Sequence, residues 1–377
     1  MIASLIALSV LVAPSELAEV FVGGIGGYPV YRIPAVVLVD ASSSDTRGRL
    51  LAFAEGRGNL ADNGSNDIVL ATSSDRGASW TAPRMICDHP GRSLNNPCVV
   101  EIREGAHAGR VLLMFQSYPT GCGEACVAEG FDSGAGPDRI CRTLVMHSDD
   151  AGNTWSHARD VTREVKHSTV ATSVATGPGV GIQLRGGAHR GRLIMPFNEG
   201  PTGKWRVYAA YSDDGGDSWK AGATARDAAK GTGNEVQVFE RDDGAIVMNA
   251  RSQGGSARRK MAISTDGGAT FGDLVDIPQL PDPSCMGGTI VVREQPQIVA
   301  FTGCDSESRR VNGTLWISTD GGRTWPQKAT IDPDGFAYSA PVALSPTEVG
   351  VLYETVGYKR IVFRRIELPK EASFDGG

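Results

Sequence analysis

The sequence has neither a large excess of charge nor a basic stripe. It contains 37 lysines and arginines against 43 aspartates and glutamates, a net charge of −6. Proteins that bind nucleic acid concentrate basic residues on one face or segment, so nucleic acid is not expected as a partner. An anionic substrate would have to be held by a few local cationic groups rather than by the field of the whole protein.

Long apolar segments are also scarce. The one sustained apolar run, Ile2 to Ala13, is too short to span a bilayer, so no stable membrane insertion is expected. Ala13-Pro14-Ser15 is an acceptable cleavage site after this run. We therefore predict a signal peptide over residues 1–18 and a secreted or periplasmic protein. A buried first strand is the alternative, because no lysine or arginine precedes the run.

Nucleotide and metal motifs are missing as well. The Gly-rich segment Val22 to Tyr28 lacks a complete Gly-x-Gly-x-x-Gly and leads into a strand-like segment, which argues against a dinucleotide loop. No cluster of histidines, cysteines or carboxylates requires a metal, and we expect no cofactor. The cysteines, of which an odd number precludes complete pairing, stand at positions 87, 98, 122, 126, 141, 285 and 304. Cys285 with Cys304, and Cys87 with Cys98, could face each other on neighbouring strands.

Helix-like apolar spacing is scarce, and turn residues recur throughout a chain with 48 glycines, which predicts an all-β fold. One pattern, Ser-x-Asp-x-Gly-x-x-Trp or Phe, recurs five times, at Ser73 to Trp80, Ser148 to Trp155, Ser212 to Trp219, Ser264 to Phe271 and Ser318 to Trp325. The Asp and Ser side chains can bond nearby backbone N–H groups, the glycine takes a backbone angle forbidden to other residues, and the aromatic ring fills a core. Units of this length with several short strands predict a β-propeller.

This repeat resembles the Asp box, or BNR repeat, of the sialidase (neuraminidase) superfamily. Further segments match the family in chain order, from about residue 20 to 367: Tyr31-Arg32-Ile33-Pro34, Gly177 to Leu184, Tyr338-Ser339 and Leu352-Tyr353-Glu354. The resemblance implies a six-bladed β-propeller with Asp-box turns, which forms one catalytic domain over residues 19–377. Because non-enzymatic proteins also carry Asp boxes, function must be argued from a site.

Three arginines are expected to bind the substrate. Sialic acid carries a carboxylate on its anomeric carbon, and the planar fork of a guanidinium matches a carboxylate as lysine cannot. The resemblance assigns this role to Arg32, Arg251 and Arg310, with Glu354 orienting Arg32. Arg309 replaces Arg310 if the register is wrong by one residue.

The same carboxylate makes an Asp or Glu nucleophile unattractive, because two anions would be forced together. A phenol avoids that repulsion, but with an unperturbed pKa of about 10 it needs a base beside it. Sialidases are known for a tyrosine nucleophile. The resemblance assigns Tyr338 as nucleophile and Glu235 as its base, and one predicted hairpin brings Glu235 close to Arg251.

A polar loop after Ala54 is expected to supply the remaining groups. The resemblance assigns Asp62 as the general acid, with Asp67 as its nearest rival, and Arg57 as a contact to the bound sugar. Asn96 stands at the expected rim of the pocket, where some bacterial relatives carry Asp. Residues 118–141 form an insertion that is either a lid or specificity loop or a plain surface decoration.

The expected activity is that of an exo-α-sialidase, a glycoside hydrolase that releases terminal α-linked sialic acids from glycoproteins, glycolipids and oligosaccharides with retention. Alternatives are a hydrolase for a related 2-keto sugar acid such as deaminated neuraminic acid, a trans-sialidase, and a non-catalytic sialic-acid-binding propeller. A binding propeller would be expected to have lost Tyr338, Glu235 or an arginine, and none is missing. We expect a monomer, although the sequence leaves the oligomeric state open.

Overall fold

The computed structural model describes residues 17–39, 48–124, 126–132, 138–167, 171–226 and 231–368. The helices within these ranges are short: α1 (Thr162–Val165), η1 (Gly187–His189) and η2 (Val356–Tyr358). No helix in the described part of the chain is long and apolar enough to cross a membrane. The signal peptide predicted over residues 1–18 lies almost wholly outside the described residues, and Ala18 already begins the first strand.

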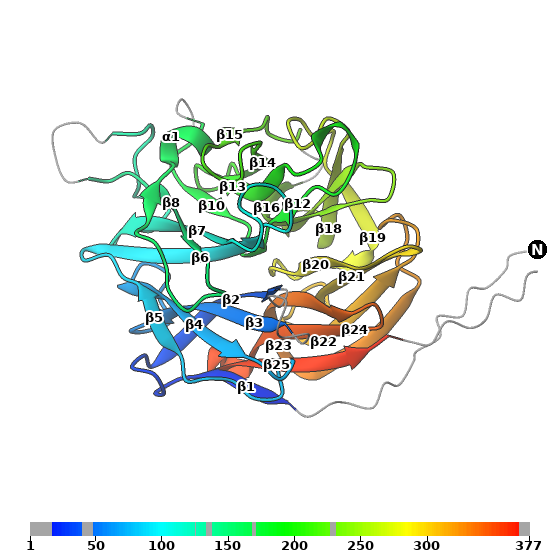
Figure 1. Cartoon of the computed structure of the whole chain (residues 1–377), viewed down its shortest axis with the longest axis horizontal. Helices are drawn as coiled ribbons and strands as arrows, with labels where there is room; N and C mark the ends of the chain where they lie inside the picture. The colour runs from blue at the N-terminus through cyan, green and yellow to red at the C-terminus, as the bar shows by residue number, and fades with distance from the viewer. Residues whose placement is uncertain are drawn as a thin grey trace, which may run out of the picture.

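The strands form five sheets within the described ranges (Figure 1). The first sheet contains β2 (Val30–Val39), β3 (Arg49–Arg57), β4 (Asn66–Ser73) and β5 (Arg84–Cys87), and the second contains β6 (Arg92–Glu101), β7 (Val111–Pro119), β8 (Arg142–Ser148), β9 (Arg159–Asp160) and β11 (Gly179–Val180). The third sheet contains β10 (Val174–Thr176), β12 (Ile182–Gln183), β13 (Leu193–Glu199), β14 (Arg206–Ser212) and β15 (Lys220–Ala221). The fourth contains β16 (Thr232–Glu240), β17 (Ile246–Gln253), β18 (Arg258–Ser264) and β19 (Val275–Pro281). The fifth contains β20 (Gly288–Glu294), β21 (Gln297–Cys304), β22 (Val311–Ser318), β23 (Gln327–Ser345), β24 (Glu348–Thr355), β25 (Arg360–Glu367) and β1 (Ala18–Val22). The fold is therefore all-β, as predicted.

The sheets lie around a common centre, and consecutive strands within a sheet are mostly antiparallel neighbours (Figure 1). The chain begins and ends in the same sheet, where β1 pairs with β25. The core lies between neighbouring sheets: Phe53 of β3 and Phe115 of β7, for example, belong to one cluster of buried side chains. This arrangement is consistent with a β-propeller, in which each sheet packs face to face against the next.

The five Asp boxes form the same turn, as the repeat predicts. In each, the serine Oγ accepts a hydrogen bond of 2.8–2.9 Å from the backbone N–H of the glycine in the pattern. The aspartate Oδ1 accepts another, also 2.8–2.9 Å, from the N–H four residues later. The glycines have φ of 78° to 92°, which a side chain would strain. Each box links the third and fourth strands of its unit, as between β4 and β5.

Asp75→Ala should lower the free energy of unfolding by about 1–2 kcal/mol at pH 7, because the backbone N–H and hydroxyl of Ser79 lose their acceptor. Hydrogen bonds from Ser79 lower the pKa of Asp75 to about 2. A depressed pKa gives stability that is present above the unfolded value of about 3.9 and is lost as the pH falls toward 2. The difference between the variant and wild type should therefore shrink between pH 4 and pH 2, measured by urea unfolding.

Ser74→Ala is the matched control, since Ser74 is exposed in the same turn. It should change the free energy of unfolding by less than about 0.5 kcal/mol at every pH. An equal loss in the two variants would show that the Asp75 hydrogen bonds do not stabilise the turn.

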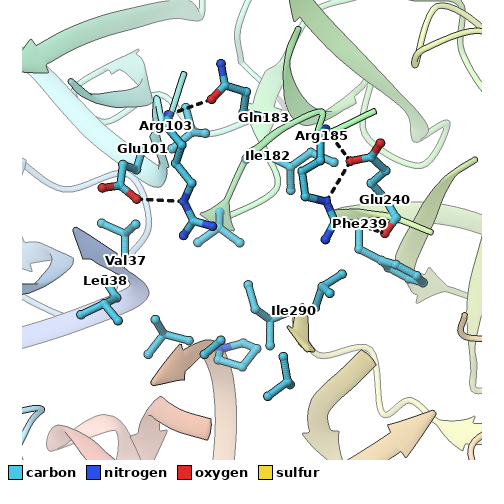
Figure 2. Close-up of a pocket in the computed structure, with 18 of the residues that line it drawn as sticks. Val37, Leu38, Glu101, Arg103, Ile182, Gln183, Arg185, Phe239, Glu240 and Ile290 are labelled. Atoms are coloured by element: carbon cyan, nitrogen blue, oxygen red, sulfur yellow. Dashed lines mark hydrogen bonds and ion pairs between the residues drawn. The ribbon is translucent and has the colours of Figure 1, made fainter. Parts of the chain in front are cut away.

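The innermost strands surround an axial cavity of about 470 Å³. Figure 2 shows its apolar wall, to which Val37 of β2, Phe239 of β16 and Ile290 of β20 contribute. Ion pairs lie at its margin, with Arg103 Nε 3.0 Å from Glu101 Oε2 and Arg185 Nε 3.0 Å from Glu240 Oε2 (Figure 2). The cavity is lined by residues toward the C-terminal ends of these strands. The residues that precede them in each strand therefore lie toward the other end of the axis.

Candidate active site

Three of the predicted site residues lie on strands next to the axis, on the N-terminal side of the segments that line the cavity. Arg32 stands near the start of β2, Glu235 near the start of β16, and Tyr338 in β23 before its cavity-lining residues. Arg251 lies toward the end of β17, the antiparallel neighbour of β16. One end of the axis thus receives side chains from strands far apart in the sequence.

Tyr338, Glu235 and Arg251 form one hydrogen-bonded group. The Tyr338 hydroxyl donates to Glu235 Oε2 at 2.7 Å. Arg251 Nη1 donates to the same Oε2 at 2.6 Å and to the Tyr338 Oη at 2.8 Å. Tyr338 is only 6% exposed, and burial raises the pKa of its phenol well above the usual value, although Arg251 opposes this shift. The phenol is therefore neutral at physiological pH and carries its proton toward Glu235.

Glu354 of β24 holds Arg32 and the backbone on both sides of the site. Arg32 Nε donates to Glu354 Oε1 at 2.6 Å and Nη2 to Oε2 at 3.2 Å. The same carboxylate accepts hydrogen bonds from the backbone N–H of Ile33, at 2.9 Å, and of Tyr338, at 3.2 Å. Burial lowers the pKa of Arg32, but the charge and hydrogen bonds of Glu354, together with Tyr338 and Tyr358, outweigh it and leave the pKa above the usual value. The fully buried Glu354 thus fixes the position of Arg32 relative to Tyr338.

Arg310 approaches the same tyrosine from a third direction. Its guanidinium carbon lies 5.3 Å from the centre of the Tyr338 ring, and that of Arg32 lies 5.4 Å from it. Arg310 Nη1 donates to the Tyr358 hydroxyl at 3.0 Å and Nη2 to the carbonyl oxygen of Ser284 at 3.0 Å. The adjacent Arg309 is exposed. The structure therefore brings Arg310, rather than its neighbour, to Tyr338 together with Arg32 and Arg251.

The loop after β3 forms a second cluster around Arg57. Arg57 Nε donates to Glu55 Oε2 at 2.7 Å and Nη1 to Asp62 Oδ1 at 2.7 Å. The Asp62 side chain is 81% exposed, whereas Arg57 is almost fully buried. The Asp62 carboxylate is therefore held at one oxygen by a fixed cation while it remains open to solvent.

Glu55 links this cluster to the rest of the site. It lies opposite Arg32 in the pairing of β2 with β3. Its Oε1 accepts a hydrogen bond of 2.7 Å from the backbone N–H of Asn96, which has a φ of 54°. Burial raises the pKa of the Glu55 carboxyl, and the Arg57 charge opposes that shift. Asp67, the rival of Asp62, instead accepts a hydrogen bond of 2.6 Å from the Tyr28 hydroxyl.

Sequence reasoning missed several residues of this site. The Ser284 Oγ lies 3.2 Å from both Nε and Nη2 of Arg251, while its carbonyl oxygen binds Arg310, so it joins two arginines. Tyr358 packs its ring 4.2 Å from the guanidinium carbon of Arg32. The turn that contains Ser284 was recognisable, since Pro283-Ser284-Cys285 precedes a Gly-Gly step. Nothing local marks Tyr358, whose role depends on packing.

The cysteines are mostly free thiols. Cys122 and Cys126 form a disulfide in the insertion, and the free thiols are those of Cys87, Cys98, Cys141, Cys285 and Cys304. Cys304 forms a hydrogen bond with Cys285, and this bond, followed by burial, raises the pKa of the Cys304 thiol. Within the described ranges, no group of three or more histidines, cysteines or carboxylates is placed to hold a metal ion.

This geometry is suited to covalent catalysis at a centre next to a carboxylate. A tyrosine hydroxyl in contact with a carboxylate can be deprotonated as it attacks, which is the usual way to activate a weak nucleophile. Three fixed guanidinium groups around it can bind an anion in a defined orientation. Asp62, whose carboxylate is accessible to solvent, lies on a separate loop from which it could deliver a proton.

The chain is similar to a family of repeat proteins and to several sialidases. The family model described as a BNR repeat-like domain matches residues 48–351. The sialidase of Micromonospora viridifaciens is 32% identical over 352 residues, which are 89% of this chain and 51% of that protein. Sialidase-3 of Mus musculus is 32% identical over 283 residues, which are 70% of this chain and 63% of that protein. The chain thus spans about half to two thirds of the length of these curated relatives.

Solved structures share the fold. The Hadza microbial sialidase Hz136 has a TM-score of 0.78 at 24% sequence identity, covering 90% of this chain and 66% of that one. The leech intramolecular trans-sialidase, complexed with 2,7-anhydro-Neu5Ac, has a TM-score of 0.79 at 18% identity, covering 94% of this chain and 70% of that one. At these identities the likeness extends to the fold alone.

Proposed function

Because the chain belongs to the sialidase family with BNR repeats, we propose that it is an exo-α-sialidase, a glycoside hydrolase that releases terminal α-linked sialic acids from glycoproteins, glycolipids and oligosaccharides. The observation that carries this proposal is the 2.7 Å hydrogen bond from the Tyr338 hydroxyl to Glu235, with Arg32, Arg251 and Arg310 around the same ring. A clamp of three arginines fits a substrate whose reacting carbon bears a carboxylate.

Arg32, Arg251 and Arg310 bind that carboxylate in this proposal. The partners that hold them in advance are Glu354 for Arg32, Glu235 and Ser284 for Arg251, and Ser284 and Tyr358 for Arg310. Because these contacts hold the guanidinium groups in place, little reorganisation is needed when the anion enters. Arg57 and Asn96 contact the sugar from the loop side.

The reaction proceeds by two displacements. Glu235 takes the proton of the Tyr338 hydroxyl as the phenolate oxygen bonds to the anomeric carbon, and Asp62 donates a proton to the departing glycosidic oxygen. The bond from the anomeric carbon to that oxygen breaks, and the alcohol leaves. Asp62, now ionised, accepts a proton from water as the water oxygen attacks the same carbon. The bond from that carbon to the Tyr338 oxygen breaks, and Tyr338 regains its proton from Glu235. Two inversions give net retention.

The proposal includes a six-bladed propeller. The N-terminal half of β23 pairs with β22 and its C-terminal half with β24, so the fifth sheet divides into two four-stranded units. With the other four sheets this makes six units, and the axial cavity is lined by an inner strand of each. We infer a single catalytic domain over residues 19–377, preceded by a signal peptide over 1–18, and hence a secreted or periplasmic enzyme.

The test is release of 4-methylumbelliferone from its α-N-acetylneuraminic acid conjugate by the wild-type chain. We expect steady release, and proton NMR of the early product should show the α-anomer before it mutarotates, as retention requires. Early β-anomer would contradict the two-step route. A folded protein inactive on this substrate but active on the deaminated analogue would move the substrate to the related 2-keto sugar acid. Inactivity on both would favour a binding propeller.

A further inference from the structure

The loop between β7 and β8 that contains the Cys122–Cys126 disulfide contacts the loop that carries Asp62. The backbone N–H of Gly121 donates to the carbonyl oxygen of Asn63 at 2.8 Å, and a Cβ added at Gly123 would lie 3.9 Å from the Asn63 Cβ. The Cys122–Cys126 disulfide closes this loop, and Cys122 is buried in the core cluster of the second and third sheets. The loop is therefore tied both to the core and to the residue next to Asp62.

Glu124 stands in the middle of this disulfide loop and faces the site. The residue reaches the surface, but protein atoms surround its carboxyl, which interacts electrostatically with Glu235 of β16, Asp62 of the β3–β4 loop and Arg251 of β17. The Glu124 carboxyl therefore lies at the edge of the candidate active site. Neither the proposed displacement steps nor the arginine clamp uses Glu124.

The position of Asp62 indicates which part of the substrate Glu124 faces. In the proposed reaction Asp62 protonates the glycosidic oxygen, so the leaving group occupies the space beside Asp62. The loop of Glu124 is hydrogen-bonded to the Asp62 loop at Asn63, whereas the arginines that bind the sialic acid carboxylate converge on Tyr338. Glu124 is therefore directed at the leaving group, or aglycone, rather than at the sialic acid carboxylate.

Resting on the proposed function, we propose that Glu124 selects the aglycone: it accepts hydrogen bonds from the hydroxyls of a neutral sugar and repels an aglycone that is itself anionic, such as a second sialic acid. A carboxylate is an acceptor without donors when ionised, so sugar hydroxyls are suitable partners. Two like charges in a partly desolvated pocket repel more strongly than in bulk water. Neutral galactose-type aglycones are thus preferred over oligosialic acid.

The selection should depend on pH. Burial raises the pKa of the Glu124 carboxyl to about 7, with the charges of Glu235 and Asp62 acting in the same direction and Arg251 opposing them. Glu124 is therefore mostly neutral below pH 6 and ionised above pH 8. The aglycone carboxylate of disialic acid is ionised throughout this range, so repulsion should grow as the pH rises through 7. Titration of the catalytic groups affects both substrates alike and cancels in their ratio.

The experiment compares kcat/KM for 3′-sialyllactose, whose aglycone is neutral, with kcat/KM for α2,8-linked disialic acid, from pH 5.5 to 8 at low ionic strength. In wild type the ratio should rise with pH about a midpoint near 7. Glu124→Gln should hold it flat and lower it about tenfold at pH 8, mainly by improving the anionic substrate. Added salt should shrink the wild-type ratio, since ions screen exposed charges. Glu124→Asp should restore the wild-type trend.

Glu129→Gln is the matched control, because it removes the same charge from an exposed position of the same insertion. It should follow wild type at every pH. If Glu124→Gln keeps the wild-type ratio across the range, Glu124 does not select the aglycone, while release of 4-methylumbelliferone by wild type would leave the proposed function standing. Absence of release from every sialoside would overturn both proposals.

Discussion

Tyr338→Phe should lower kcat/KM for the fluorogenic sialoside by about 10³-fold or more, the scale seen when a catalytic nucleophile is removed. The variant keeps the ring that packs under Arg32 and Arg310 and loses only the hydroxyl, which is 2.7 Å from Glu235 and 2.8 Å from Arg251. Because the three arginines remain, KM or the Kd for free sialic acid should change little. Initial rates and equilibrium binding measure the two effects separately.

Tyr358→Phe provides a matched control for this prediction. It removes a phenol hydroxyl from the same site, the one bonded to Arg310 at 3.0 Å, while it keeps the ring beside Arg32. One hydrogen bond to a charged group is worth about 1.5–3 kcal/mol at most, so a loss of about tenfold to 100-fold is expected. If Tyr338→Phe lost no more activity than Tyr358→Phe, Tyr338 would not be the nucleophile.

The elements that could be predicted from sequence are those whose contacts are local. All the side-chain contacts that define an Asp box fall within eight residues, as from Ser212 to Trp219, so the pattern itself contains the turn. The all-β fold follows from the same repetition. That β23 runs for 19 residues through two units was not predictable, because the turn-forming run Asp332-Pro333-Asp334-Gly335 in its middle indicates a break between two strands.

The candidate site depends on long-range pairs that no local pattern encodes. Arg32 and Glu354 are 322 residues apart, and Tyr338 and Glu235 are 103 apart, so only the family resemblance suggested that they meet. The residues that resemblance did not supply, such as Ser284, act through neighbours brought by the fold. No motif marks Glu124, which lies within an insertion. The number and spacing of the seven cysteines did not indicate that Cys122 pairs with Cys126.

Arg310→Ala should lower kcat/KM for the same sialoside by about 10²–10³-fold, the cost of removing one partner from a desolvated, hydrogen-bonded charge pair. In the structure Arg310 is held by Tyr358 and by the carbonyl oxygen of Ser284, with its guanidinium over the Tyr338 ring. Its proposed partner, the substrate carboxylate, is present in both the ground state and the transition state. KM should therefore rise, and kcat should fall as the anomeric carbon loses its alignment with Tyr338.

Arg309→Ala tests whether the charge or its position matters, because it removes the same charge one residue earlier from an exposed side chain. Its kcat/KM should stay within about threefold of wild type, as expected for a rim charge. A small shared loss in both variants would mean that only the overall positive field attracts the substrate. A large loss in Arg309→Ala with little change in Arg310→Ala would shift the third arginine by one residue and contradict the geometry around Tyr338. Only loss confined to Arg310→Ala is consistent with a clamp built from Arg32, Arg251 and Arg310.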